Sequence, residues 1–302
     1  MKKDFISIAD WSREELDAVF ALSAELKAKQ KRGEPHPRLQ GKTLGLIFEK
    51  SSTRTRVSFE VGMVQLGGYP LFLDSRNTQL GRGEPIEDTA RVLSRYLDGI
   101  MIRTFAHDNV TEMARWASVP VINGLSDLLH PCQVMADLFT VLEHKKSFQD
   151  LAFCWIGDGN NMANSWINAA AVFGFELRLA VPKGYEPDTA ILERARALNP
   201  RILLTTDPRQ AARGAHVLNT DVWASMGQEQ EQQQRQRDFA GFQVNNELLA
   251  VADPECVVLH CLPAHRGEEI SAEVLEGPHS VVFDEAENRL HVQKAILATL
   301  MG

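Results

Sequence analysis

The feature of this sequence that most constrains its fold is a regular alternation of short apolar runs with longer segments of helical period. Strands that alternate with helices predict βαβ units and a parallel sheet covered on both faces. Two such series imply an α/β protein with two doubly wound parallel-sheet domains, and a boundary near Glu143–Gln149. The expected strands are Thr43–Phe48, Gly99–Arg103 and Val119–Ile122 in the first series, then Leu151–Ile156, Glu176–Val181, Ile202–Leu204, Ala215–Asn219, Val257–Cys261 and Ser280–Phe283 in the second.

Length and composition favour a globular enzyme-sized chain over a nucleic-acid or membrane protein. The 302 residues exceed what one small core organises, and the 44% hydrophobic and 24% charged residues are ordinary for soluble proteins. A formal net charge of -8 argues against nucleic acid as the main partner. Because no secretory signal or membrane-spanning run is visible, we expect a cytoplasmic protein with reduced thiols. Its cysteines are Cys132, Cys154, Cys256 and Cys261.

Two further segments have a readable local pattern. Ser12 and Glu15 have the spacing of a capping box, and apolar residues then recur at helical spacing, so the chain is expected to open with a helix used for packing. The Gln/Glu-rich stretch Gln228–Asp238 is interpreted as a solvated helix or a mobile loop.

The motif Ser52-Thr53-Arg54-Thr55-Arg56 directly follows the expected strand Thr43–Phe48. A strand-to-helix turn presents unpaired backbone N–H groups and the positive end of the helix dipole, which suits a phosphate. Three hydroxyls and two guanidiniums add donors that bind phosphate oxygens. The alternative, a Ser/Thr helix cap with two solvated arginines, stays open on this motif alone. The glycine pattern of a Walker loop is missing.

The motif His130-Pro131-Cys132-Gln133 follows the expected strand Val119–Ile122 and a turn-like Asn123-Gly124. An imidazole and an amide three residues apart on a first helical turn share a face. Both would point toward the carboxyl end of the sheet, where open α/β folds bind ligands. A structural histidine is the competing interpretation.

Three more motifs end expected strands of the second series. In His260-Cys261-Leu262-Pro263 the cysteine is either a functional group or a small buried hydrophobe. Asp221, followed by Ser225-Met226-Gly227, is either the partner of an ammonium group or a helix cap. Gly157-Asp158-Gly159-Asn160-Asn161 lacks the G-x-G-x-x-G spacing, which disfavours a nicotinamide cofactor. The His/Cys spacings do not match zinc sites, so no metal is expected.

The joint order of these motifs is more specific than any one of them. Ser-Thr-Arg-Thr-Arg, His-Pro-x-Gln, Asp-x-x-x-Ser-Met-Gly, His-Cys-Leu-Pro and a final Glu-Asn-Arg resemble the aspartate/ornithine carbamoyltransferase family over essentially the whole chain. The Ser-Met-Gly and His-Cys-Leu-Pro motifs resemble its ornithine branch. The resemblance implies a carbamoyl phosphate domain at residues 1–145, an ornithine domain at 146–285, an active site in the cleft between them, and a last helix at about 286–302 that packs back on the first domain.

The resemblance also implies residue roles. Catalytic roles fall on Arg103, His130 and Cys261. Residues implied to bind carbamoyl phosphate are Ser52, Thr53, Arg54, Thr55, Gln79, Arg103, His130, Pro131, Cys132, Gln133, Cys261, Leu262 and Arg289. Residues implied to bind ornithine are Asn161, Asp221, Ser225 and Met226. Gln79 matches a position that reaches into a neighbouring subunit's site, which implies a trimer with shared active sites.

The activity implied is transfer of a carbamoyl group from carbamoyl phosphate to L-ornithine, giving L-citrulline and phosphate in arginine metabolism. The amine attacks the carbamoyl carbon directly, so no cofactor or metal is implied. The nearest alternative is a sister enzyme that acts on aspartate, putrescine or an acylated ornithine. A non-catalytic anion-binding homologue and a zinc hydrolase are alternatives from other classes.

Overall fold

The computed structural model describes residues 2–77, 79, 83–225, 227 and 229–302. The chain forms two compact units, of which the first combines Met1–Ala136 with Glu287–Gly302 and the second is Asp137–Ala286. Each unit contains one parallel sheet, so the fold is α/β with two such sheets. The helices α5 (Pro131–Lys145) and α12 (Val282–Met301) each include residues of both units.

The sheet of the first unit has the strand order β2-β1-β3-β4, and every pairing is parallel. Its inner strands are buried on both faces, as a parallel sheet covered by helices requires. Apolar side chains of β1 and β3, such as Ile47 and Ile102, pack with Val110 and Met113 of α4. The strands are β1 (Thr43–Phe48), β2 (Tyr69–Asp74), β3 (Gly99–Arg103) and β4 (Val121–Leu125).

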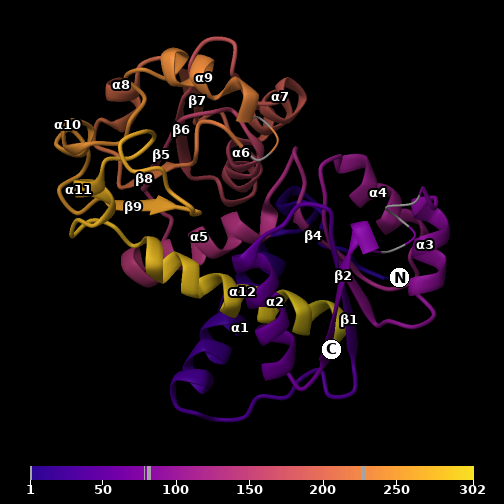
Figure 1. Cartoon of the computed structure of the whole chain (residues 1–302). Coiled ribbons are helices and arrows are strands. Elements are labelled where there is room, and N and C mark those ends of the chain that lie inside the picture. Colours follow the sequence, from indigo (N-terminus) through magenta and orange to yellow (C-terminus); the bar gives the residue numbers. More distant parts are fainter. Residues whose placement is uncertain (1, 78, 80–82, 226, 228) are drawn as a thin grey trace. The chain divides into compact units, whose positions relative to one another are not determined.

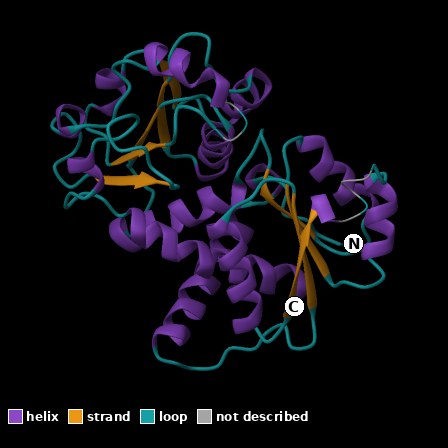
Figure 2. Cartoon of the chain, in the orientation of Figure 1, coloured by secondary structure: helices purple, strands orange, loops and turns teal. Residues whose placement is uncertain are grey.

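The helices α1 and α2 of the first unit each begin after a serine whose side chain caps them. Before α1 the side chain of Ser12 accepts from the Glu15 N–H and Glu15 accepts in return, which confirms the predicted capping box. Ser52 caps α2 in the same way at the Thr55 N–H. Figure 2 shows helices on both faces of this sheet. They are η1 (Ile8–Asp10), α1 (Arg13–Lys31), α2 (Thr53–Gln65), η2 (Ser75–Asn77), α3 (Ile86–Leu93) and α4 (His107–Trp116).

The sheet of the second unit has the order β7-β6-β5-β8-β9 and is again parallel throughout. The chain order reverses next to β5, so the β5 and β8 carboxyl ends border the position where doubly wound folds bind ligands. The strands are β5 (Ala152–Ile156), β6 (Glu176–Ala180), β7 (Ile202–Thr205), β8 (Val217–Thr220) and β9 (Val257–His260).

The two faces of the second sheet are packed differently. An aromatic cluster joins β5 to α6, with Phe153 and Phe175 rings 4.1 Å apart and Phe153 and Trp166 rings 5.4 Å apart. The other face buries Ala211 of α8 and Val274 of α11 against β5 and β8. The helices are α6 (Asn161–Phe173), α7 (Thr189–Leu198), α8 (Pro208–Ala212), η4 (Glu229–Glu231), α9 (Gln232–Asp238), α10 (Asn246–Leu249) and α11 (Ala272–Leu275).

The structure corrects three details of the predicted elements. The segment Ser280–Phe283 is not a strand, because Ser280 makes a single bridge to Val258 and α12 then begins at Val282. The pair Asn123-Gly124 is not a turn but lies inside β4. The edge strand β2 was not predicted from the sequence. No helix among the described residues is both long and apolar enough to cross a membrane.

Candidate functional site

The first candidate site lies where β1 leads into α2. Ser52 caps the helix, with the Thr55 N–H donating to its Oγ at 3.2 Å. The first turn of α2 contains no acidic residue, so the positive end of the helix dipole is not neutralised there. A pocket of about 340 Å³ opens beside this turn. Its lining residues are Phe48, Glu49, Ser51, Ser52, Thr53, Arg56, Phe72, Asp74 and Arg76.

Two buried arginines from distant parts of the chain meet at Thr55. Arg103 ends β3 and donates to Thr55 Oγ1 at 3.4 Å, and Arg289 of α12 donates to the same oxygen at 2.7 Å. Arg289 also donates to Gln133 Oε1 on α5. Both guanidiniums are more than nine-tenths buried. The first unit therefore gathers fixed positive charge at the carboxyl edge of its sheet, which is the property that an anion site needs.

His130 lies in the field of these cations. Its pKa is held well below the ordinary value, first by burial and then by the guanidiniums of Arg289, Arg103 and Arg54. The imidazole is consequently neutral at physiological pH. A neutral imidazole offers one N–H donor and one acceptor, so it can donate a hydrogen bond to a ligand oxygen while it stays uncharged.

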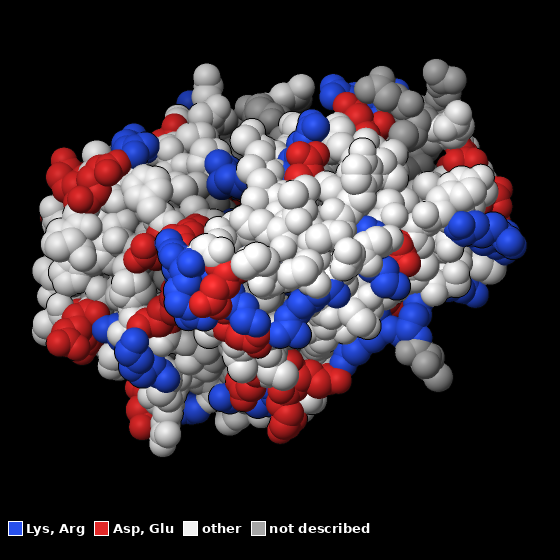
Figure 3. Space-filling view, turned by 90° about the horizontal axis from the view of Figure 1, so that it is seen from below, with Lys and Arg blue, Asp and Glu red and all other residues white. Residues whose placement is uncertain are grey.

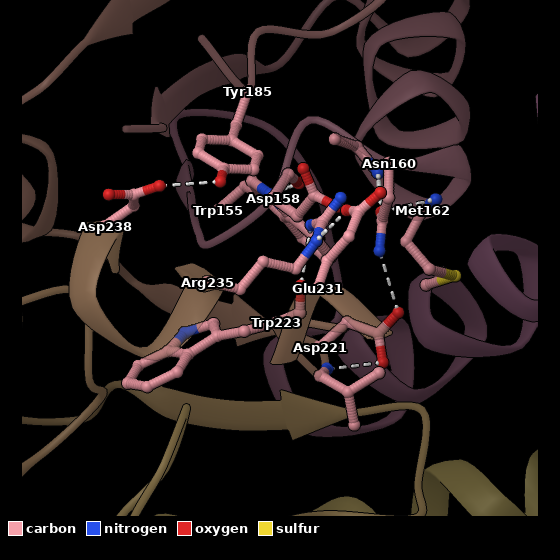
Figure 4. A network of polar contacts seen from close by, with 12 residues as sticks. Trp155, Asp158, Asn160, Met162, Tyr185, Asp221, Trp223, Glu231, Arg235 and Asp238 are labelled. Atoms are coloured by element: carbon pink, nitrogen blue, oxygen red, sulfur yellow. Dashed lines mark hydrogen bonds and ion pairs between the residues drawn. The ribbon is translucent and has the colours of Figure 1, made fainter. Parts of the chain in front are cut away.

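The second candidate site lies at the carboxyl ends of β8 and β9. Asp221 directly follows β8, and its Oδ1 accepts from the Cys261 Sγ at 3.1 Å and from the Val222 N–H at 2.8 Å. Asn160 donates to the other oxygen of Asp221 at 3.0 Å (Figure 4). Burial and the adjacent Asp221 carboxylate raise the pKa of the Cys261 thiol well above its ordinary value. Cys261 is therefore a neutral S–H donor.

A second polar network is centred on Arg235 and includes the segment that follows Asp221. Arg235 of α9 donates to Asp158 Oδ2 at 2.8 Å and to the Trp223 carbonyl at 2.7 Å, and its Nε donates to Glu231 at 3.0 Å (Figure 4). Arg235 and Asp158 are both at least nine-tenths buried. Trp223 belongs to the segment between Asp221 and Ser225. The contact with Arg235 therefore ties that segment to the loop after β5.

Burial raises the pKa of Asp158 from 3.8 to about 6. The Arg235 guanidinium opposes this rise, and the Asp221 carboxylate adds to it. Asp158 thus ionises in a pH range where its neighbour Arg235 is fully charged. At pH values above the pKa of Asp158 both groups carry their charge, and the electrostatic attraction between them has its full strength.

Comparison with known proteins gives the family. A family model described as the carbamoyl-P binding domain of aspartate/ornithine carbamoyltransferase matches residues 3–143, and its Asp/Orn binding domain matches residues 149–300. The chain belongs to the aspartate/ornithine carbamoyltransferase family.

The similarity to individual carbamoyltransferases extends over full lengths. The ornithine carbamoyltransferase of Syntrophotalea carbinolica is 69% identical over 302 residues, and that of Geobacter sulfurreducens is 61% identical over 302 residues, each with 100% of both chains covered. The solved ornithine carbamoyltransferase from Pyrococcus furiosus superimposes with a TM-score of 0.96 at 48% identity, covering 100% of this chain and 97% of that one. The predicted family is confirmed.

Within this carbamoyltransferase fold, the structure brings together several predicted residues in each unit. In the first unit Thr55, Arg103, Gln133 and Arg289 form one hydrogen-bonded set. In the second, Cys261 and Asp221 are in direct contact. Pro131 begins α5, and the buried Cys132 donates to the Asn123 carbonyl at 3.4 Å.

Other predicted residues are described only by their surroundings. Gln79 is exposed, Ser225 is half-buried, and Asn161 is the first residue of α6. Met226 lies outside the described residues. The roles predicted for these four residues stay predictions.

Three residues of the polar networks beside Asp221 were not predicted from the sequence as candidate site residues: Asn160, Asp158 and Arg235. Asn160 and Asp158 belong to the motif Gly157-Asp158-Gly159-Asn160-Asn161, in which Asn160 caps α6 and also donates to Asp221. Arg235 stands in the Gln/Glu-rich stretch, where one buried arginine gives no local signal. Residues 229–238 of the stretch form η4 and α9, in agreement with the helix rather than the loop of the two predicted alternatives.

Proposed function

We propose that this protein transfers the carbamoyl group of carbamoyl phosphate to the δ-amine of L-ornithine, releasing L-citrulline and phosphate in arginine metabolism. The observation that carries the proposal is the buried, neutral His130 among three guanidiniums at the start of a helix. That combination suits a ligand with a phosphate at one end and a carbonyl oxygen at the other. The full-length similarity to proteins named ornithine carbamoyltransferase supports ornithine as the acceptor.

Carbamoyl phosphate is proposed to bind to the first unit through its phosphate. The N–H groups of the first turn of α2, with Ser52, Thr53, Arg54 and Thr55, would hold the phosphoryl oxygens. Arg103, His130 and Gln133 would contact the carbamoyl group and the bridging oxygen. Arg289 orients Gln133 and Thr55 through its two hydrogen bonds, so it is proposed to organise the site as well as to add charge.

The reaction is proposed to proceed by direct attack of the amine on the carbamoyl carbon. A new C–N bond forms as the carbonyl becomes a tetrahedral oxyanion, which donors on Thr55, Arg103 and His130 would stabilise by about 3–4 kcal/mol each. The bond to the phosphate oxygen then breaks. Phosphate leaves with the electron pair, and it accepts the proton that the amine loses.

A covalent carbamoyl-enzyme is disfavoured by the state of Cys261. The thiolate is the nucleophilic form of cysteine, and the raised pKa of Cys261 keeps its thiol protonated. Cys261 is proposed instead to orient the attacking nitrogen, together with the Asp221 carboxylate 3.1 Å away. With an amine pKa near 10.4, about one ornithine molecule in a thousand is neutral at physiological pH, so selecting that form costs roughly 4 kcal/mol.

The acceptor is proposed to be free ornithine because of the charge on Asp221. This carboxylate is 8% exposed, and a dicarboxylate acceptor such as aspartate would be repelled by it. An N-acylated ornithine would lack the α-ammonium group proposed to pair with this end of the site, together with Asn161, Ser225 and Met226. Putrescine would lack the carboxylate that these groups are proposed to bind.

The assembly is proposed to be a homotrimer in which Gln79 of one subunit completes the phosphate site of the next. Figure 3 shows acidic and basic side chains interspersed over the face that it draws, unlike the continuous basic patch that is typical of a nucleic-acid-binding surface. A cytoplasmic location and the absence of a metal or cofactor stay predictions from the sequence.

A substrate panel tests the proposal. Purified protein is incubated with carbamoyl phosphate and, in turn, ornithine, aspartate, putrescine or N-acetylornithine, and the carbamoylated product is measured. We expect citrulline to form with a specificity constant at least about a hundredfold above that of the other products, which corresponds to about 2.7 kcal/mol. A preference for another acceptor would replace ornithine in the proposal. No turnover with any amine would support a non-catalytic anion-binding protein instead.

A further inference from the structure

A histidine and a glutamate form a fully buried pair in the second unit. His260 is the last residue of β9, and its Nε2 lies 2.9 Å from Glu269 Oε1. Both side chains are 0% exposed. Buried charged or polar pairs are costly unless every group is hydrogen-bonded, so such a pair calls for a specific explanation.

The other contacts of this pair determine where the imidazole proton lies. The Leu262 N–H donates to His260 Nδ1 at 2.9 Å, so Nδ1 carries no proton. The proton therefore lies on Nε2 and is donated to Glu269 Oε1. Glu269 Oε1 also accepts from the His265 N–H at 2.6 Å. The imidazole is fixed as the neutral Nε2–H tautomer, assigned from these partners.

Hydrogen bonds of His260, one from its backbone and one to its ring, fix the backbone on both sides of Cys261. The His260 N–H donates to Glu285 Oε2 at 2.9 Å, while the His260 ring accepts from Leu262 two residues later. Leu262 has φ +58, a left-handed conformation that is unfavourable for a residue with a Cβ. A hydrogen bond from its N–H to a fixed imidazole selects that conformation. The Cys261 thiol, which donates to Asp221 Oδ1 at 3.1 Å, lies between these two fixed positions of the backbone.

A metal site is the competing explanation. Asp221, His260 and Cys261 offer ligand atoms within 4.8 Å of one another. However, a metal-binding imidazole needs a nitrogen lone pair, and both His260 nitrogens already have partners in Leu262 and Glu269. The hydrogen bonds therefore favour a structural role for the ring.

We propose that His260 and Glu269 are positioning residues, which fix the Leu262 backbone through a single imidazole tautomer and thereby aim the Cys261 thiol at Asp221. This inference rests on the proposed function, since it gives Cys261 and Leu262 a part in the reaction. It predicts that efficient use of ornithine requires a hydrogen-bond acceptor at the Nδ1 position of His260. The hydrogen bond at Nε2 contributes indirectly, because it holds the ring proton on Nε2 and so leaves Nδ1 unprotonated.

The two ring nitrogens can be replaced separately. The amide oxygen of asparagine lies near the Nδ1 position and that of glutamine near the Nε2 position. Both His260→Asn and His260→Gln are made together with Glu269→Gln, so that no uncompensated carboxylate is left in the core. Glu269→Gln alone keeps an acceptor oxygen, and Glu268→Gln changes the neighbouring, partly exposed carboxylate as a matched control.

Kinetics then separate the two sides of the ring. We expect Glu268→Gln, Glu269→Gln and the His260→Asn double variant to keep kcat/KM for ornithine within about threefold of the value for the unsubstituted protein. The His260→Gln double variant should lose at least tenfold, because the Leu262 N–H has no acceptor. Its Kd for carbamoyl phosphate should stay within about twofold, which distinguishes positioning from general loss of folded protein. Equal kinetics for the asparagine and glutamine double variants would overturn the proposal.

The tautomer supplies a test that depends on neither variant folding nor activity. The ¹⁵N spectrum of histidine-labelled wild-type protein separates a protonated ring nitrogen from an unprotonated one. We expect the buried His260 to show a protonated Nε2 and an unprotonated Nδ1 at neutral pH. A protonated Nδ1 would refute the positioning role even if citrulline is formed. Conversely, absence of citrulline with the expected tautomer would refute the proposed function and leave the geometry of the turn established.

Discussion

Replacing Arg235 with methionine tests whether a buried ion pair holds the segment after Asp221. Arg235 makes three hydrogen bonds of 2.7 to 3.0 Å, to Asp158, Glu231 and the Trp223 carbonyl. Methionine fills much of the same volume but leaves the Asp158 carboxylate buried without its partner. Removing one member of a buried pair costs about 3–5 kcal/mol, and we expect the free energy of unfolding of the second unit to fall by that amount at pH 8.

The assay is urea unfolding followed by tryptophan fluorescence, because Trp155, Trp166 and Trp223 all lie in the second unit. A double-mutant cycle adds Asp158→Asn, alone and with Arg235→Met. We expect the coupling between the two changes to be at least about 2 kcal/mol at pH 8. At pH 5 it should be smaller, because Asp158 with a pKa of about 6 is then mostly protonated. Arg237→Met, at an exposed position on the same helix, is the control and should change stability by less than about 0.5 kcal/mol.

The same variant has a functional readout. Loss of the hydrogen bond to the Trp223 carbonyl frees the segment that joins Asp221 to Ser225, so KM for ornithine should rise about tenfold while carbamoyl phosphate affinity is unchanged. Additive stability effects at both pH values would show that Arg235 and Asp158 do not act as a pair. A rise in the Kd for carbamoyl phosphate of the same size as that in KM would refute the assignment of this network to the ornithine side.

Three further predictions follow from the charges of the two sites. Arg54→Leu should lower kcat/KM at least tenfold by removing a charged hydrogen bond of ~1.5–3 kcal/mol, and steady-state kinetics with near-normal values would remove Arg54 from the site. Cys261→Ala should weaken ornithine use more than carbamoyl phosphate binding in titrations, and the reverse order would misplace the thiol. The raised pKa of Asp158 stabilises the folded state most below about pH 4, so wild-type stability relative to Asp158→Asn should fall by up to about 3 kcal/mol as the pH rises through about 6, measured by urea unfolding.

Much of the fold was predictable because parallel strands buried on both faces give continuous apolar runs. Strand β2 was not predicted because it is a half-exposed edge strand. Its residues, Tyr69–Asp74, include a proline and end in a carboxylate. The segment Ser280–Phe283 was wrongly predicted to be a strand for the opposite reason. Its apolar residues Val281 and Val282 are buried, as in a strand, but the helical period of α12 begins within it. A short apolar run cannot distinguish these cases without its neighbours.

The arrangement of the candidate site was predictable where its residues lie in compact motifs. Ser52 to Thr55 and His130 to Gln133 each lie at the beginning of a helix that follows a strand, so a short motif was enough to place them there. The pairs that join distant segments were not predictable. Arg235 and Asp158 are 77 residues apart, and nothing in a Gln/Glu-rich stretch indicates which of its cations is buried. The contact between His260 and Glu269 likewise required the path of the loop between them.

The position of Arg289 has one more implication, for the time at which a newly made chain could complete the proposed anion site. This arginine contacts Thr55 from a position 234 residues later in the sequence, on the last helix of the chain. A polypeptide that stops before residue 289, whether still on the ribosome or clipped by a protease, has the loop at Ser52 but lacks one of the cations that surrounds His130. Loss of the part of α12 from Arg289 onward would thus impair the proposed anion site, although the motif that begins at Ser52 is intact.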